Sequence, residues 1–290
     1  MKERINIRPM KESDVEDAYR MSGLALSESA EEKERIMSRS PEAAERRKAR
    51  YRHFLRHDPE GAWVAADGER LAGLAIALVR EELWILSLFA VDAEYRNAGI
   101  GRRLLEHTLA YGSGCKGGMI ASSAHPAAMR SYALAGFNLL PTLMARGTVK
   151  AGFAPPPSVR EGTDRDLELV AEVDRFVRGA AHGPDIEILL RTGGRLLISE
   201  DPAGYAVEES GSPHLVAATA PRTAADLLRA VLARSSEGEA VEVRWISGSQ
   251  SPWAVPVVLE AGLSLSPAGP ICVRGEPGAL APYLPSGPFL

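Results

Sequence analysis

A strand, a glycine-bearing turn and a helix follow one another between Leu83 and Gly112, and this order constrains the fold more than any other feature. The run Leu83–Val91 is apolar and long enough for a buried strand. The loop Arg96–Gly101 follows, and helical spacing of apolar residues begins at Leu104. Glycines allow a tight turn, and a helix N-terminus presents unpaired N–H groups and partial positive charge. The stretch therefore predicts an anion site suited to a phosphorylated ligand.

Two common phosphate-binding loops fit this stretch poorly. A dinucleotide-binding loop needs a third glycine where this chain has Leu104, and an acidic residue about 20 positions further on, where it has serines. A Walker loop needs Lys and Ser or Thr after its glycines, but Gly101 is followed by Arg102 and Arg103. A plain turn without a ligand remains an alternative.

Two motifs resemble the GCN5-related N-acetyltransferase (GNAT) family. Arg96, Gly99 and Gly101 match its R/Q-x-x-G-x-G/A loop, which holds the pyrophosphate of acetyl-CoA. The segment from His125 to Phe137 is similar to the family's N-P-x-A-x-x-x-Y-x-x-x-G-F helix, with His125 in place of the usual asparagine. Over residues 4–149 the expected elements also come in the family's order.

The N-terminal segment and a hairpin agree with this order. Residues 5–21 read as a strand, a turn and a helix, with Ser13 as the N-cap and Glu16 completing a capping box. Residues 58–80 read as a hairpin that turns at Asp67 and Gly68.

Bulk composition bounds the class of protein. A chain of 290 residues, 45% apolar and 25% charged, suggests two globular domains. Residues 1–150 hold 23 Lys+Arg against 20 Asp+Glu, and residues 151–290 hold 11 against 18, so neither half is basic enough for nucleic acid. The first ten residues lack a signal-peptide core, and no apolar run is long enough for a membrane. Cys115 and Cys272 lack metal or redox spacing, so we expect a cytoplasmic protein without a metal.

The chain repeats itself faintly after a proline-rich stretch. The pattern around Val159–Glu168 echoes Ile7–Glu16, and Glu260–Pro267 echoes Leu134–Pro141. The two offsets, 152 and 126, differ by 26 residues, and Glu31–His57 is the candidate for the extra segment of the first copy. We predict an α/β fold with two GNAT-like domains, each a mixed, mostly antiparallel twisted sheet flanked by helices, at residues 1–150 and 158–290 with a linker at 151–157.

The second copy has no glycines at the equivalent turn. Matching Leu227 to Leu104 places Thr219 opposite Arg96 and Arg222 opposite Gly99. We therefore expect the second domain to be degenerate, to lack the pyrophosphate loop and to serve in packing, capping or shaping the acceptor site.

The resemblance implies an acetyl-CoA-dependent N-acyltransferase in which an amine attacks the thioester directly. It implies that Tyr132 is the general acid and that the backbone N–H of Phe89 contacts the oxyanion. Ser87, at a position where many family members carry a base, could hold a water. It further implies a cofactor site built from Leu88, Phe89, Ala90, Val91, Arg96, Asn97, Ala98, Gly99, Ile100, Gly101, Arg102, His125 and Tyr132.

The missing base bears on the acceptor. Glu81, Glu82, His53 and His57 could reach the acceptor from loops, but the sequence does not place them. An amine of pKa about 10.4 is only roughly 0.1% neutral near pH 7.4, whereas an α-amine near 7.8 is about 30% neutral. A site without a strong base favours small-molecule or peptide α-amines.

Two further alternatives stay open. The basic stretch Glu45–His57 reads either as a solvated amphipathic helix or as an electropositive lid that steers an acidic acceptor or the cofactor. The chain reads either as an enzyme or as an acyl-CoA-binding sensor without turnover, and the acyl-chain length, the acceptor and the oligomeric state, a homodimer included, are open.

Overall fold

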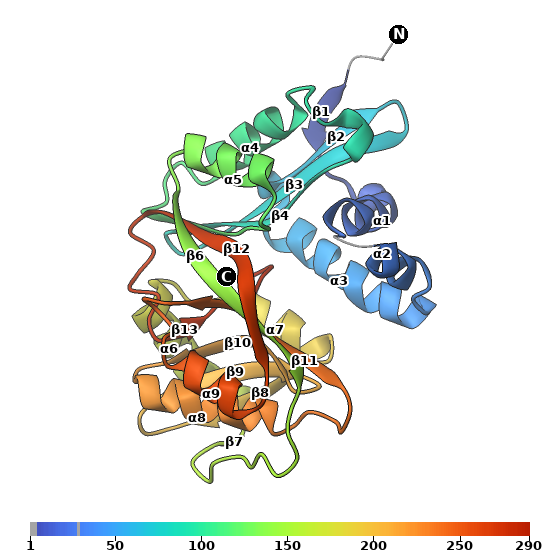
Figure 1. Cartoon of the computed structure of the whole chain (residues 1–290). Coiled ribbons are helices and arrows are strands. Elements are labelled where there is room, and N and C mark those ends of the chain that lie inside the picture. The colour runs from blue at the N-terminus through green and yellow to red at the C-terminus, as the bar shows by residue number, and fades with distance from the viewer. Residues whose placement is uncertain (1–4, 28–29) are drawn as a thin grey trace. The chain divides into compact units, whose positions relative to one another are not determined.

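The chain has the expected α/β architecture of mostly antiparallel sheets flanked by helices (Figure 1). The structure, a computed structural model, describes residues 5–27 and 30–290. It divides into two compact units, Met1–Val79 with Trp84–Cys115, and Arg80–Leu83 with Lys116–Leu290. Within the described residues, no helix is long and apolar enough to cross a membrane.

The first unit is a sheet in the order β1-β2-β3-β4 with helices packed on it. Helices α1, α2 and α3 lie beside one another in Figure 1, and α4 packs on β2. Ala72, Ala75, Ile100 and Leu104 belong to the core beneath α4. The elements are β1 (Asn6–Pro9), α1 (Val15–Leu26), α2 (Ala30–Met37), α3 (Pro41–His57), β2 (Ala62–Asp67), β3 (Arg70–Arg80), β4 (Leu83–Val91) and α4 (Ile100–Tyr111).

The expected N-cap of α1 is wrong. A short 3-10 turn, Glu12–Asp14, precedes the helix, and Ser13 does not cap it. The Asp14 carboxylate instead accepts the backbone N–H of Lys11 at 2.7 Å and binds both terminal nitrogens of Arg8 at 2.7 and 2.8 Å. Asp14 therefore occupies the N-cap position of α1, but its carboxylate is bound to Arg8 and Lys11 and makes no capping hydrogen bond to the helix.

The second unit contains two sheets, in the orders β5-β12-β6-β11 and β13-β10-β9-β8-β7. In the second of these, Ala206 joins the core under α8, while its neighbour Tyr205 donates a hydrogen bond to Asp174 of α6 on the opposite face. The elements are β5 (Gly117–Ala121), α5 (Pro126–Leu134), β6 (Asn138–Thr148), β7 (Arg160–Glu161), α6 (Leu167–Arg178), α7 (Pro184–Arg191), β8 (Arg195–Ser199), β9 (Gly204–Glu209), β10 (Ser212–Ala218), α8 (Pro221–Leu232), β11 (Ala240–Ser247), α9 (Ala254–Glu260), β12 (Ser264–Gly275) and β13 (Tyr283–Leu284).

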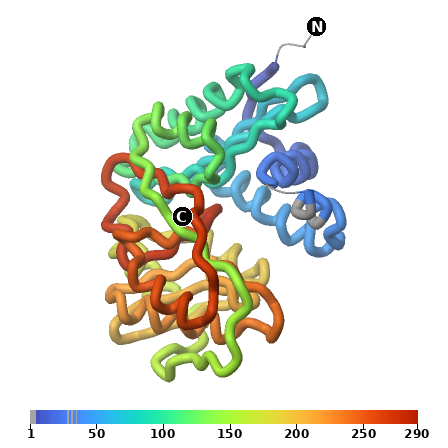
Figure 2. The backbone as a smooth tube through the Cα atoms, in the orientation of Figure 1, coloured from blue at the N-terminus to red at the C-terminus, as the bar shows by residue number. Residues whose placement is uncertain are grey.

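Strands from the two ends of the second unit's sequence are interleaved. The late strand β12 pairs antiparallel with both β5 and β6, so that Cys272 lies opposite Ile120 on one side and Leu139 on the other. Strand β6 in turn pairs with β11. Figure 2 follows the chain as β6 and β12 run side by side. The domain boundaries expected at 150 and 158 stay a prediction, because units defined by packing do not mark the ends of a duplicated sequence.

The repeat has matching local structure at its beginning. Arg8 binds Asp14 at 2.7 and 2.8 Å, and Arg160 binds Asp166 at 2.7 and 3.1 Å. Each aspartate also accepts the backbone N–H of the residue three positions before it, at 2.7 Å in both cases. The same clamp therefore starts both copies, at the offset of 152 residues read from the sequence.

The repeat also matches near its end. Gly136 and Gly262 follow α5 and α9 with φ of +85° and +90°. In each case the next residue donates to a carbonyl five positions back, that of Tyr132 at 3.1 Å and that of Val258 at 2.9 Å. These are two equivalent Schellman ends, and glycine is needed there because the backbone is left-handed.

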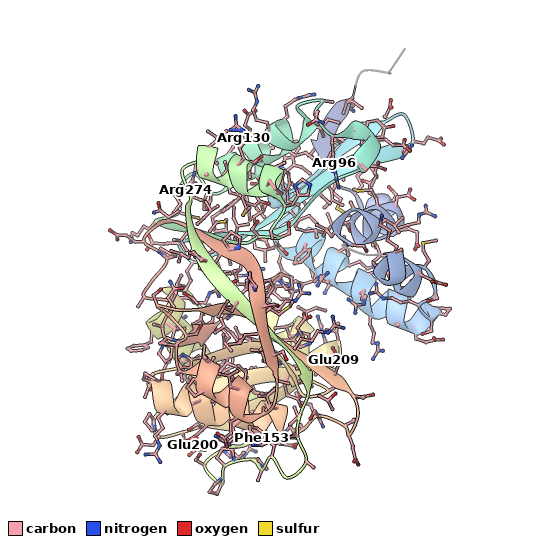
Figure 3. The ribbon with its side chains drawn as sticks, in the orientation of Figure 1. Arg96, Arg130, Phe153, Glu200, Glu209 and Arg274 are labelled. Atoms are coloured by element: carbon pink, nitrogen blue, oxygen red, sulfur yellow. The ribbon has the colours of Figure 1, made fainter. Side chains whose placement is uncertain are left out.

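The first copy has an additional helix. In the described part of the chain, α2 and α3 lie between α1 and β2, whereas α7 alone lies between α6 and β8. Helix α3 falls in the segment expected to be extra, and its Tyr51 and Phe54 are buried, while Leu55 is half-buried. The proline-rich stretch packs through Phe153, labelled in Figure 3, whose ring centre lies 5.0 Å from the Arg229 guanidinium.

Candidate functional site

The loop after β4 is anchored by charged contacts on its outer side. Asp92 accepts the backbone N–H of Glu94 at 2.9 Å, and Arg70 binds both carboxylates at 2.8 Å. Burial alone raises the pKa of Asp92, but these hydrogen bonds and the nearby charge of Arg96 hold it below its usual value. The hydroxyl of Tyr95 donates to Asp67 at 2.9 Å. The start of the loop is thus fixed before the glycines are reached.

The glycines then turn the backbone into α4. Asn97 and Gly99 both have left-handed backbones, with φ of +66° and +74°. Gly99 is the N-cap of α4 and provides no side-chain cap, so the first-turn amides have no intrahelical partner. A Cβ on Gly99 would meet no described atom within 4 Å, while one on Gly101 would lie 3.3 Å from the ring of Phe89. Gly99 is required by conformation, and Gly101 by the close approach of helix and strand.

Positive side chains surround this turn. Arg96, labelled in Figure 3, is exposed and its Nε donates to the carbonyl of Val91 at 3.5 Å. Arg102 and Arg103 are exposed on the first turn of α4, and Arg102 lies 3.4 Å from Glu106. The N-terminal amides of α4 and these three arginines form an anion cradle, the kind of arrangement that binds anions at helix N-termini.

The burial of strand β4 decreases from its start towards Ser87, Leu88 and Phe89. Residues 83–86 are buried, whereas Ser87, Leu88 and Phe89 are half-buried. The hydroxyl oxygen of Ser87 is itself buried and has no hydrogen-bond partner among the described residues. A buried hydroxyl without a partner costs about 1–3 kcal/mol, so a water or a ligand group would be favourable there.

A cavity of about 170 Å³ lies in the first unit and is lined by residues of α1, α2, α3 and β4, Leu88 among them. Of the basic residues in the stretch Glu45–His57, Arg47 and Arg50 line it, whereas Arg46 is exposed and is not among the described lining residues. Tyr19, Ser22 and Arg39 also line it and were missed by sequence reasoning.

One signal could have found part of this set. On α1 the lining positions 19, 22, 23 and 26 follow helical spacing and share one face, but sequence alone does not say which face meets a ligand. Arg39 lies between α2 and α3, and no pattern in the sequence marked it as a residue that lines a cavity.

Tyr132 lies on α5 in the second unit and is 4% exposed. Burial, with a smaller effect from Cys272 on β12, raises the pKa of the phenol well above its ordinary value. Burial also raises the pKa of Cys272 to about 12. The phenol therefore keeps its proton at all ordinary pH values, and Cys272, which comes from the second copy, belongs to its surroundings.

His125 caps α5. Its Nδ1 accepts the backbone N–H of Ala127 at 3.2 Å, which fixes this nitrogen as an acceptor, and the residue is exposed. The expected contact of His125 with a cofactor stays a prediction.

The candidate bases lie apart from the cavity lining. Glu81 and Glu82, in the second unit, bind Arg175 at 2.8 Å and Lys116 at 2.5 Å. His53 is buried on α3, and its ring centre lies 4.6 Å from that of His57. None of the described lining residues of the cavity is Asp, Glu or His.

The second copy differs at the equivalent turn. Strand β10 ends at Ala218 and α8 begins at Pro221, so two residues replace the eight between β4 and α4. Pro221 has no N–H, which removes one donor from the helix start. The loop is therefore shortened as well as free of glycine.

The edge of β10 is taken by the C-terminal tail. Strand β13 pairs with it antiparallel, Tyr283 opposite Ala217 and Leu284 opposite Val216. These β10 residues stand one and two positions before the strand end, as Ala90 and Phe89 do in β4. The tail ends buried, with Phe289 1% and Leu290 0% exposed.

Comparison with solved structures identifies this fold. A protein of Pyrococcus horikoshii described as a candidate acetyltransferase has a TM-score of 0.75 at 17% identity, covering 97% of this chain and 93% of that chain. A GCN5-related N-acetyltransferase of Kribbella flavida has a TM-score of 0.59 at 17% identity, with coverages of 94% and 71%. A tandem GNAT protein of the clavulanic acid biosynthesis pathway has a TM-score of 0.56 at 13% identity, with coverages of 94% and 98%. The fold is that of a tandem GNAT protein.

The sequence itself supports the family. Residues 26–137 match the model of the acetyltransferase (GNAT) family. No curated protein matches the chain. The expected resemblance is confirmed, and the segment that matches the family model includes the glycine loop.

Proposed function

We propose that this protein is an acetyl-CoA-dependent N-acetyltransferase with one active site, in its first copy. The observation that carries the proposal is the anion cradle of Gly99, Gly101 and the uncapped start of α4, inside the segment that matches the family. GNAT family proteins are acetyltransferases, and the fold supports that activity. The acceptor proposed is a primary amine of low pKa on a small molecule or a peptide.

Acetyl-CoA would supply the activated acyl group as a thioester. The first-turn amides of α4, with Arg96, would bind its pyrophosphate. The edge of β4 from Leu88 to Val91 would hold the extended arm, as an additional strand would be held, and the backbone N–H of Phe89 would donate to the oxyanion.

Tyr132 would donate the proton to the leaving thiolate. An ordinary phenol is about 1.5 pKa units weaker as an acid than the thiol it protonates, an uphill transfer of roughly 2 kcal/mol. The raised pKa of Tyr132 makes the transfer more uphill in this state, but it guarantees that the proton is present. Ser87 would hold a water that accepts the proton of the amine.

The second copy is proposed to bind no acetyl-CoA. Its turn is six residues shorter, eight against two, and it starts its helix with a proline. The backbone edge of β10 that would receive the cofactor is already paired with Tyr283 and Leu284. The tail thus occupies in the second copy the edge proposed for the cofactor in the first.

One observation favours a second candidate, an acyl-CoA-binding protein without turnover. In the part of the chain that the structure describes, the cavity lining contains no Asp, Glu or His to serve as a base. An enzyme restricted to low-pKa amines accounts for the same observation, because such amines are partly neutral without a base.

Calorimetry with acetyl-CoA and a thiol-release assay with a mixed amine panel test the proposal. We expect one equivalent to bind, thiol release with at least one α-amine, and a fall in kcat of about 10²–10⁴-fold in Tyr132→Phe with little change in acetyl-CoA binding. Binding of one equivalent without turnover on any amine would establish the second candidate. Binding of two equivalents would refute the proposal for the second copy.

A further inference from the structure

The cavity in the first unit is walled by α1, α2 and α3 and reaches β4. Helix α1 contributes Tyr19 and Ser22, α3 contributes Arg50 and Tyr51, and Leu88 comes from β4. Leu88 directly precedes Phe89, whose N–H is proposed to contact the reacting carbonyl. A molecule in this cavity therefore lies beside the proposed place of acyl transfer. Its volume of about 170 Å³ suits a small head group rather than a drug-sized molecule, which needs about 300–1,000 Å³.

Positive charge is concentrated on this cavity. Arg39, Arg47 and Arg50 line it, and none of the described lining residues is acidic. Arg39 and Arg50 form no ion pair within the described ranges, 5–27 and 30–290. The Nε of Arg50 is buried and has no hydrogen-bond partner there either. A buried guanidinium nitrogen needs an acceptor, and an anionic oxygen is the strongest one.

Two other cations of α3, Lys48 and Arg52, are paired with carboxylates. Lys48 binds Glu16 at 2.6 Å, and Arg52 binds Glu12 at 2.8 Å and Glu45 at 3.0 Å. Carboxylates of α3, of α1 and of the turn before α1 therefore pair with Lys48 and Arg52, whereas Arg50 lines the cavity. This difference points to a ligand whose negative charge would pair with Arg50.

The hydroxyls of Ser22 and Tyr51 are already hydrogen-bonded, so the arginines are the main hydrogen-bond donors to a ligand in the cavity. Ser22 donates to the carbonyl of Ala18 at 2.6 Å, so its oxygen accepts the proton of the Tyr51 hydroxyl, also at 2.6 Å. Burial raises the pKa of Tyr51 more than the charge and the hydrogen bond of the neighbouring Arg50 lower it, so the phenol stays neutral and does not repel an anion. Tyr19 accepts from Arg39 at 3.3 Å and keeps its own proton for a ligand.

We propose that this cavity binds an anionic group, a carboxylate or a phosphate, carried by the amine acceptor. The inference rests on the proposed acetyltransferase function and names its substrate class. The planar guanidinium of Arg50 would bind the two oxygens of such a group, and the amine would point along Leu88 towards the thioester.

Matched α-amines test this. Aspartic acid α-amide and asparagine α-amide differ in one side-chain carboxylate, and phosphoserine amide and serine amide differ in one phosphate. Each pair is assayed for thiol release at saturating acetyl-CoA, and for binding to the CoA-loaded protein by calorimetry. The variants are Arg50→Gln, Arg50→Lys and, as the control, Arg46→Gln, which removes the same charge from the same helix outside the cavity.

We expect the wild type to prefer the anionic member of at least one pair, and the preferred pair identifies carboxylate or phosphate. Arg50→Gln should lower kcat/KM for that anion by about 10–100-fold and for its neutral partner by less than about 3-fold. The kcat/KM of Arg50→Lys for that anion should lie between those of the wild type and Arg50→Gln, since lysine keeps the charge but lacks the planar guanidinium group. Arg46→Gln should match the wild type, and the acetyl-CoA KM should not change.

Three results would overturn the inference. These are equal use of anionic and neutral amines, equal effects of Arg46→Gln and Arg50→Gln, or an Arg50→Gln effect confined to the acetyl-CoA KM, which would assign the cavity to the cofactor. Failure of the proposed function is distinguishable, because it appears as no thiol release with any amine. The binding arm still decides the inference in that case, since anion binding lost in Arg50→Gln and kept in Arg46→Gln supports it, and no anion binding refutes it.

Discussion

Replacing Gly99 with Asn or Asp separates backbone conformation from charge at the proposed phosphate site. The φ of this residue is +74°, and a Cβ there meets no described atom within 4 Å, so a side chain fits without a clash. Asn tolerates a left-handed backbone better than most residues, and Asp has the same shape with a negative charge. The difference between the two variants is therefore the effect of the charge.

The magnitude follows from Coulomb's law. A carboxylate about 6 Å from a phosphate oxygen, at an effective dielectric of about 40, is repelled by about 1.4 kcal/mol per phosphate charge, or about 1–3 kcal/mol for a pyrophosphate. We expect Gly99→Asp to bind acetyl-CoA about 5–150-fold more weakly than Gly99→Asn, with the ratio falling as salt is raised.

Calorimetric titration of acetyl-CoA into each variant at two salt concentrations measures this ratio. Arg222→Asn and Arg222→Asp, at the equivalent turn of the second copy, are the matched control pair and should bind equally well. Equal dissociation constants for Gly99→Asn and Gly99→Asp would refute the reasoning that phosphate lies at this turn.

Three further predictions concern the second unit. Phe289→Ala should lower the free energy of unfolding by about 3–5 kcal/mol in a denaturant titration, because the ring is 1% exposed and packs the tail that pairs with β10; a loss below about 1 kcal/mol would contradict this role. Cys272, whose pKa is raised to about 12, should resist alkylation at pH 8 in the folded protein while the half-buried Cys115 reacts faster, as mass spectrometry before and after denaturation would show. Burial lowers the pKa of His182 below the unfolded value of about 6.5, so the unfolded state binds the extra proton in this pH range. The free energy of unfolding should therefore fall as pH drops below about 6.5, by at most about 1.4 kcal/mol per pH unit. His182→Gln should flatten that slope in pH-dependent unfolding, and an unchanged slope would contradict it.

Features that depend on neighbours in the chain could be predicted from sequence. The glycine turn follows from Gly99 and Gly101 because their conformations are set within a few residues, and the structure has the left-handed backbone at Gly99. The duplication followed for the same reason, since the clamps of Arg8 and Arg160 each lie within seven consecutive residues. The exception is Ser13, because α1 begins one residue later than expected, with Asp14 at its N-cap position.

The arrangement of distant segments was decided by tertiary structure. Periodicity shows which side of a helix is apolar, but it does not show which other element will face its polar residues. Arg39, Tyr19 and Arg50 come together around one cavity only because α1 and α3 pack near β4. The insertion of β12 between β5 and β6, and the pairing of the tail with β10, depend on backbone hydrogen bonds. Every residue can make such bonds, so residue identity alone does not select the partner strand; the closure and packing of the whole chain do.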